Sequence, residues 1–140
     1  PILCAPQCII DKGIENGVAK YMVDKTLKVK DAHVKSVKKA YKQGIQIALG
    51  TDAGTPFNYH NNTAYEMELL ARLNIPNMDI LKIATINFAR CVGVEKDYGS
   101  IEVGKQADLV CLEENPLENI SNVRKINKVI QSGKIVVENN

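Results

Sequence analysis

The side chains best suited to catalysis lie in the polar stretch at residues 51–60, directly after an apolar run at residues 46–50. Asp52 is the second residue of this stretch. A carboxylate at the end of a buried strand can bind a divalent cation and accept a proton from the water that attacks a carbonyl carbon. The alternative is a turn aspartate, because Asp before small residues favours turns in many proteins.

Other polar residues have weaker claims to chemistry. His60 lies eight residues after Asp52 and could donate a hydrogen bond to a substrate, although an exposed loop histidine is equally ordinary. Glu66 and Glu68 stand near the start of a predicted helix, where carboxylates stabilise the positive end of the helix dipole. Asp108 precedes a predicted strand, and we expect its carboxylate to accept a backbone hydrogen bond at a turn.

The elements that position Asp52 follow from the spacing of apolar residues. Residues 1–6 predict a strand followed by a loop, and residues 23–43 predict an amphipathic helix that ends at Gly44. The run at residues 46–50 predicts a strand buried on both faces. Strand, helix and strand make one βαβ unit, with Asp52 at the carboxyl end of its second strand, where α/β folds place their active sites.

The rest of the chain changes character near residue 97. Two further helices are predicted, at residues 63–74 and 78–92, and the sequence after Tyr98 consists of turns and short β-rich runs. We therefore expect two parts, residues 1–97 and residues 98–140.

Four stretches, in this order along the chain, resemble the amidohydrolase superfamily, and more narrowly its imidazolonepropionase-like and prolidase-like members. The stretches are residues 50–57 (GTDAGTPF), 84–89 (ATINFA), 99–110 (GSIEVGKQADLV), and 115–120 with 133–136 (NPLENI and GKIV). The resemblance covers only the C-terminal portion of the family. It implies an α/β chain made of the last strand–helix modules of a (β/α)8 TIM-type barrel, residues 1–97, and part of a small β-sandwich, residues 98–140.

The resemblance also implies an activity. It is that of a metal-dependent hydrolase of amide-type carbon–nitrogen bonds, acting on a small molecule such as a dipeptide, an acylated amino acid or a cyclic amide. Asp52 would be the catalytic residue and a ligand of a divalent metal, expected to be zinc, and His60 would bind substrate. The family's His-x-His pair is absent, because the chain contains only His33 and His60. We therefore expect no tightly bound metal, and no activity, in this chain alone.

The length of the chain sets a limit on the fold. A closed eight-stranded barrel needs about 200 to 250 residues, so 140 residues give an incomplete barrel. Its strands would leave unpaired edges and apolar helix faces. Either a missing N-terminal part or association into a homo-oligomer is expected to cover them. The start at Pro1, without Met, indicates an internal or processed N-terminus.

Composition excludes several other classes of protein. The longest apolar runs are far shorter than the roughly 20 residues that cross a bilayer, so no membrane association is expected. Four cysteines are scattered among apolar neighbours, which predicts buried, reduced thiols and a cytoplasmic location. The alternative to an enzyme is a truncated, non-enzymatic relative that serves as an oligomeric scaffold.

Basic charge is concentrated in one segment. Residues 20–43 contain eight lysines against Asp24 and Asp31, within a chain of net charge +2. Five of the lysines, Lys25, Lys28, Lys35, Lys39 and Lys42, share one face of the predicted helix. His33 within this helix is expected to be structural. Nucleic-acid binding would require arginines or interleaved aromatic residues beside the lysines, so we expect a solvated outer helix and no nucleic-acid partner.

Overall fold

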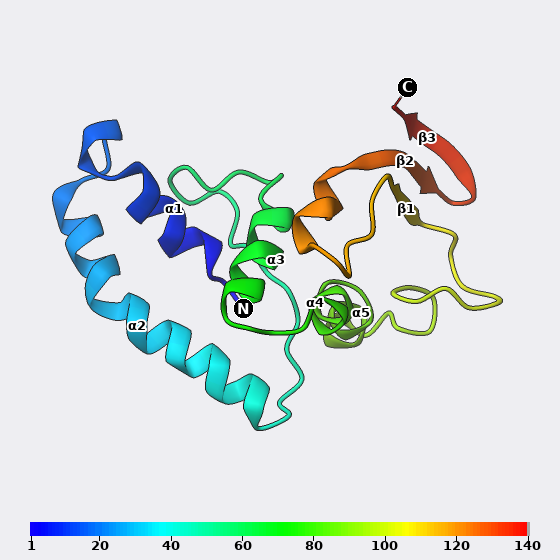
Figure 1. The fold of residues 1–140 in the computed structure, drawn as a ribbon, viewed down its shortest axis with the longest axis horizontal. Helices are drawn as coiled ribbons and strands as arrows, with labels where there is room; N and C mark the ends of the chain where they lie inside the picture. The colour runs from blue at the N-terminus through cyan, green and yellow to red at the C-terminus, as the bar shows by residue number, and fades with distance from the viewer. Residues whose placement is uncertain (140) are drawn as a thin grey trace.

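The computed structural model describes residues 1–139, with the helices gathered on one side and a small sheet on the other (Figure 1). The α-helices are α1 (Cys4–Lys12), α2 (Lys20–Lys42), α3 (Thr63–Arg72), α4 (Asn77–Ala84) and α5 (Ile86–Val92). Two short 3-10 helices complete the chain: η1 (Ile14–Asn16) connects α1 to α2, and η2 (Ile120–Arg124) lies between β1 and β2 in the sequence. The strands β1 (Leu109–Leu112), β2 (Ile126–Gln131) and β3 (Lys134–Glu138) form an antiparallel sheet in the order β1-β2-β3.

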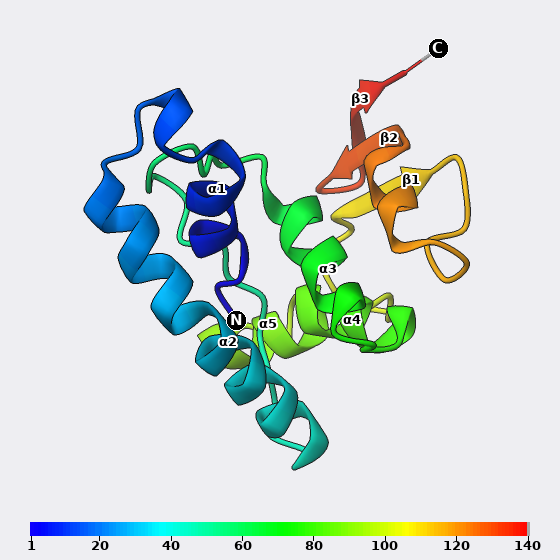
Figure 2. The ribbon, with the colours of Figure 1, turned by 60° about the vertical axis from the view of Figure 1, so that its left-hand side comes forward.

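Helix α2 is the amphipathic helix that the sequence predicts, and it packs beside α1 at the edge of the molecule (Figure 2). Val37 and Thr26 are buried on its inner side. His33 is half-buried, in agreement with a structural role. Leu27, however, is 53% exposed although it shares the apolar face. Helix α2 therefore has apolar surface that the described part of the chain does not cover.

The strand predicted for residues 1–6 is wrong, because helix α1 begins at Cys4. The buried carboxylate of Glu66, on α3, accepts hydrogen bonds from the backbone N–H of Leu3 (2.9 and 2.8 Å) and of Cys4 (2.6 Å). The first N–H groups of a helix have no partner within the helix, and Glu66 supplies one. The expectation that Glu66 stabilises the start of its own helix is also wrong, since its carboxylate caps α1.

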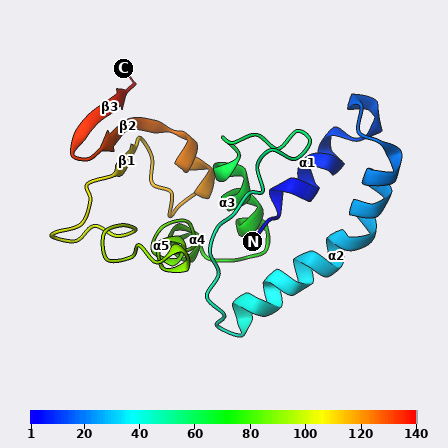
Figure 3. The same cartoon turned by 180° about the vertical axis from the view of Figure 1, so that it is seen from behind.

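The strand predicted for residues 46–50 belongs to no sheet in the described chain. The segment passes the N-terminus on its way to the loop before α3 (Figure 3), and a Cβ placed on Gly50 would lie 3.9 Å from the carbonyl oxygen of Pro1. Its hydrogen bonds go to helices: the Leu49 N–H donates to the Ile83 carbonyl (3.1 Å), and Asn87 Nδ2 donates to the Ile47 carbonyl (3.2 Å). The predicted burial on both faces is therefore wrong: Gln46 is exposed, residues 47–50 are only half-buried, and no strand lies beside the segment.

The helix predicted for residues 78–92 is broken at Thr85, which has φ −122° and ψ −95° and separates α4 from α5. Helix α5 then packs closely against the turn at Gly99. A Cβ on Gly99 would lie 2.8 Å from the Ala89 Cβ and 2.9 Å from the Ile86 Cα. The break thus accommodates a close approach between helix and turn that helical periodicity does not reveal.

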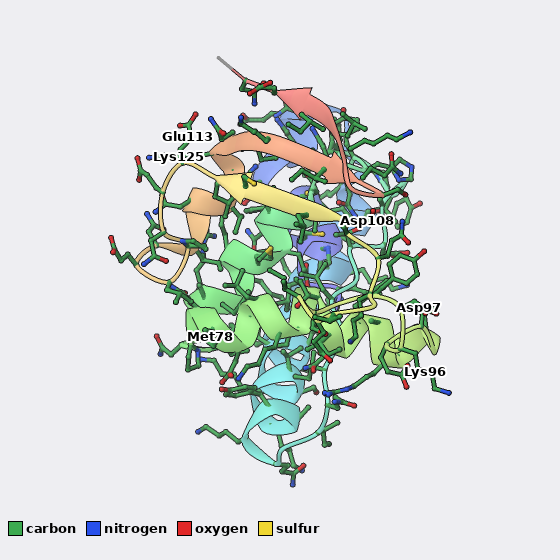
Figure 4. The ribbon with its side chains drawn as sticks, turned by 90° about the vertical axis from the view of Figure 1, so that its right-hand side faces the viewer. Met78, Lys96, Asp97, Asp108, Glu113 and Lys125 are labelled. Atoms are coloured by element: carbon green, nitrogen blue, oxygen red, sulfur yellow. The ribbon has the colours of Figure 1, made fainter. Side chains whose placement is uncertain are left out.

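The small sheet is tied together at both ends of β1 (Figure 4). Asp108, at one end, accepts a hydrogen bond from the backbone N–H of Ser132 (2.7 Å), which confirms its predicted role at a turn. At the other end, the Glu113 N–H donates to the Lys125 carbonyl (2.9 Å). The residues of β3 are all exposed, so the sheet has one uncovered edge and much open surface.

The core lies around α3 and α4, where Leu70 and Ile80 are fully buried. Cys4 and Cys8 are buried, as predicted, but Cys91 and Cys111 are exposed, so the prediction is wrong for those two. All four are free thiols. Among the described residues, no helix has the length and apolar character that a membrane crossing requires.

Candidate functional site

The loop at residues 51–62 follows the apolar segment and leads into α3 (Figure 3). Asp52 is the second residue of this loop. Its side chain is exposed, and its backbone is left-handed, with φ 54°. Asp tolerates this conformation better than most residues because its short polar side chain can bond locally. Within residues 1–139 the carbonyl of Asp52 is hydrogen-bonded, whereas its carboxylate has no such bond. The carboxylate is thus available to a ligand.

The buried side chain of Asn58 holds the Asp52 loop in place through hydrogen bonds to its backbone. Its side chain is buried, with 1% exposure, and Nδ2 donates to the carbonyl oxygens of Thr51 (2.6 Å) and Asp52 (2.9 Å). Backbone bonds close the same loop: the Asn58 N–H donates to the Thr55 carbonyl (3.0 Å), and the Gly54 N–H donates to the Asn58 carbonyl (2.9 Å). The loop is therefore a compact turn built around one carboxamide.

Cys4 connects helix α1 to this loop. Its single S–H is shared between two acceptors, the Thr51 carbonyl (3.2 Å) and Oδ1 of Asn58 (3.5 Å). Burial, together with the nearby carboxylate of Glu66, raises the pKa of Cys4 to about 12. The thiolate is the nucleophilic form of cysteine, so Cys4 acts here as a hydrogen-bond donor and not as a nucleophile.

Glu66, on α3, holds the first turn of α1, which carries Cys4. Burial raises the pKa of Glu66, while its hydrogen bonds from Leu3 and Cys4 act in the opposite direction. These bonds fix the first turn of α1 and therefore the position of the Cys4 thiol. The spacing of Glu66 from Leu69 and Leu70, three and four residues, could have placed it on the buried face of α3. No local pattern distinguishes Asn58 from an ordinary turn residue.

His60 lies on the exposed turn just before α3. It is in the same loop as Asp52, but within the described chain no hydrogen bond joins the two side chains. Its assignment to substrate binding stays a prediction.

The capacity of this chain to hold a metal is limited. Within residues 1–139, no group of three or more His, Cys, Asp or Glu side chains is arranged to bind a metal ion. A zinc site has three or four protein ligands, whereas the loop offers the carboxylate of Asp52. A metal centre at Asp52 would need further ligands besides this carboxylate.

A cavity of about 550 Å³ separates the helices from the sheet. Its walls include Met67 and Leu81 on the helical side and Leu109 and Ile126 on the strands. Neither Asp52 nor His60 lines it. The cavity is a mainly apolar gap between the helices and the sheet, and of the loop at residues 51–62 only Asn61 lines it.

Comparisons with known proteins match nearly the whole chain. The model of the amidohydrolase family matches residues 6–136. A 5-methylthioadenosine/S-adenosylhomocysteine deaminase from Thermoanaerobacter pseudethanolicus is 35% identical over 119 residues, 70% of this chain and 27% of that protein. An imidazolonepropionase from Shouchella clausii is 33% identical over 99 residues, 68% of this chain and 22% of that protein.

Among solved structures, a Xaa-Pro dipeptidase with methionine bound in its active site superposes with a TM-score of 0.85 at 30% identity. The superposition covers 98% of this chain and 33% of the dipeptidase. The chain thus spans about a quarter of the curated relatives and a third of this structural neighbour.

Proposed function

The chain belongs to the amidohydrolase family, and from this premise we propose that it contributes Asp52 to the active site of a hydrolase of amide-type carbon–nitrogen bonds. The chain would form the C-terminal part of that enzyme, with residues 1–97 in its barrel and residues 98–140 in its small β-sandwich. The names of the relatives, a deaminase, an imidazolonepropionase and a Xaa-Pro dipeptidase, support this class of reaction.

The proposal depends on the environment of Asp52. Its backbone is held by Asn58 while its carboxylate is exposed. Such a carboxylate can take a proton from water as the water oxygen adds to the carbonyl carbon. It can return that proton to the nitrogen as the carbon–nitrogen bond breaks. A turn aspartate would instead use its carboxylate on neighbouring backbone groups.

The complete enzyme would use a divalent metal, with zinc as our proposal. When bound, the metal would polarise the carbonyl group of the substrate. Asp52 would be one ligand, and the others would come from parts of the enzyme outside this chain. His60, on the exposed turn that follows, would contact the substrate. The free thiols of all four cysteines support a cytoplasmic location.

Hydrolysis by the complete protein tests this function. The protein, loaded with zinc, would be assayed for the new amino group that hydrolysis forms from a dipeptide, from an acylated amino acid and, by ring opening, from a cyclic amide. We expect turnover of at least one class, loss of turnover with a chelator, and recovery when zinc is returned. Absence of hydrolysis in all three classes would favour the alternative of a non-enzymatic scaffold.

A further inference from the structure

We infer that Asn58 is a positioning residue for Asp52, which sets the direction of the catalytic carboxylate through the backbone. This inference rests on the proposed function of Asp52. It assigns a task to a buried side chain that lies six residues away in the sequence and has no contact of its own with solvent.

The geometry of the two carbonyl contacts carries the inference. The carbonyl of Thr51 belongs to the peptide unit before the Asp52 Cα, and the carbonyl of Asp52 belongs to the unit after it. Nδ2 of Asn58 donates to both, at 2.6 and 2.9 Å. Fixing the two peptide units on either side of one Cα fixes its φ and ψ, and hence the direction of its Cα–Cβ bond.

The conformation that is held needs such a restraint. Asp52 is left-handed, with φ 54°, a region that residues other than glycine adopt at a cost in free energy. Residues keep unfavourable backbone angles where the surrounding structure imposes them, and these positions cluster at functional sites. The two hydrogen bonds from Asn58 provide that constraint at Asp52.

The orientation of the Asn58 carboxamide is itself determined. Carbonyl oxygens only accept hydrogen bonds, so the nitrogen must face Thr51 and Asp52. On the other side, Oδ1 accepts from Asn62 Nδ2 (3.0 Å) and from the Cys4 thiol (3.5 Å). Asn62, directly before α3, and Cys4 on α1 thus fix the orientation of the Asn58 carboxamide, which in turn fixes the loop.

The variant Asn58→Asp, in the complete enzyme, separates positioning from general packing. An aspartate keeps the shape and the accepting oxygen but cannot donate to both carbonyls. We expect kcat to fall by about 10- to 100-fold with little change in KM, since a misplacement of about 1 Å can have an effect of that size. Asn61→Asp, at an exposed neighbouring asparagine, is the matched control and should retain wild-type kcat.

A double-mutant cycle provides the decisive readout. If Asn58 acts through Asp52, then Asn58→Asp should lower the residual kcat of an Asp52→Asn enzyme by less than about threefold, because coupled residues are not additive. A purely structural role predicts the same fold-loss in both backgrounds. If Asn58→Asp does not fold, as judged by thermal unfolding, Asn62→Ser removes one bond to Asn58. It should reduce kcat in the wild-type background alone.

The outcomes distinguish the inference from the proposed function. Wild-type kcat in both Asn58→Asp and Asn62→Ser, or equal losses in the two backgrounds, would overturn the positioning role while leaving Asp52 as the base. Wild-type kcat in Asp52→Asn would overturn the proposed function, and the role of Asn58 with it.

Discussion

Asp52 and Asn58 lie in the same loop but differ in their exposure to solvent. Asp52 is exposed and uses its backbone carbonyl for structure, whereas Asn58 is buried and uses its side chain for structure. The position of Asp52 directly after an apolar run is enough to make it a candidate catalytic residue from the sequence alone. The burial of Asn58 was not predictable, because it depends on contacts with Cys4 and Asn62 that form only in the folded chain.

Thiol reactivity gives a first test at this scale. We expect iodoacetamide at about pH 8 to modify Cys111 in the folded chain and to leave Cys4 unmodified, because Cys4 is buried and its pKa is raised to about 12. Peptide mass spectrometry of the labelled chain measures both sites, and labelling in urea provides the control. Modification of Cys4 at the rate of Cys111 in the folded chain would contradict the burial described here.

The cap on α1 gives a second test. Glu66→Gln replaces an accepting oxygen by an NH2 group that faces the backbone N–H groups of Leu3 and Cys4. We expect the free energy of unfolding to fall by about 2 to 3 kcal/mol, the range for losing hydrogen bonds to a buried charged group. Urea unfolding measures it. Glu113→Gln, at an exposed position of the sheet end, is the control and should change stability little.

Among the secondary-structure elements, the sequence predicts a helix well when the residues that begin, end and bury it lie within the same segment. Helix α2 spans Lys20–Lys42 against a prediction of residues 23–43, because its apolar spacing and the following glycine lie within the segment itself. Helix α1 was missed because its cap is Glu66, more than 60 residues away. The segment at residues 46–50 was predicted as a strand from burial, but a strand also requires a paired neighbour.

The junction between helices and sheet depends on an ion pair. Arg124, on η2, donates to the two carboxylate oxygens of Glu68 on α3, at 2.7 and 3.1 Å. The hydrogen bond from Arg124 lowers the pKa of Glu68 below its ordinary value of 4.5. A carboxyl group whose pKa is lower in the folded state stabilises the fold above its unfolded pKa, and this stabilisation is lost as pH falls through the folded pKa.

We therefore expect Glu68→Gln to lower the free energy of unfolding by about 1 kcal/mol or less near neutral pH, since Arg124 is about half exposed to screening solvent. The difference from the wild type should shrink as the pH falls below 4.5 and through the lowered pKa of Glu68, because the protonated carboxyl is as neutral as the glutamine. Urea unfolding across this pH range is the measurement. A difference that persists unchanged at the acidic end would show that the ion pair does not cause it.

At the scale of the whole molecule, apolar surface is left open on both parts of the chain. Ile101 is 87% exposed near the turn after α5, and Val29 on α2 is half exposed. Large exposed apolar patches mark surfaces that associate with another chain. The uncovered edge at β3 adds unpaired backbone groups to this surface.

We predict that the 140-residue chain self-associates to at least a dimer at micromolar concentration. Sedimentation velocity over a concentration series measures the state, and a dye that fluoresces on apolar surface reports what stays open. A compact monomer at every concentration, with no dye binding, would mean that the exposed residues are accommodated without a partner.

Turnover by Asp52→Asn decides whether Asp52 is the catalytic base of the complete enzyme. Asn keeps the size of Asp and its tolerance for a left-handed backbone, but it cannot accept the proton from water. We predict that kcat falls by about a hundredfold to ten-thousandfold, while the thermal midpoint stays near that of the wild type. A variant that folds normally and keeps more than about a tenth of wild-type kcat would contradict the claim, because a turn aspartate and a turn asparagine are nearly equivalent.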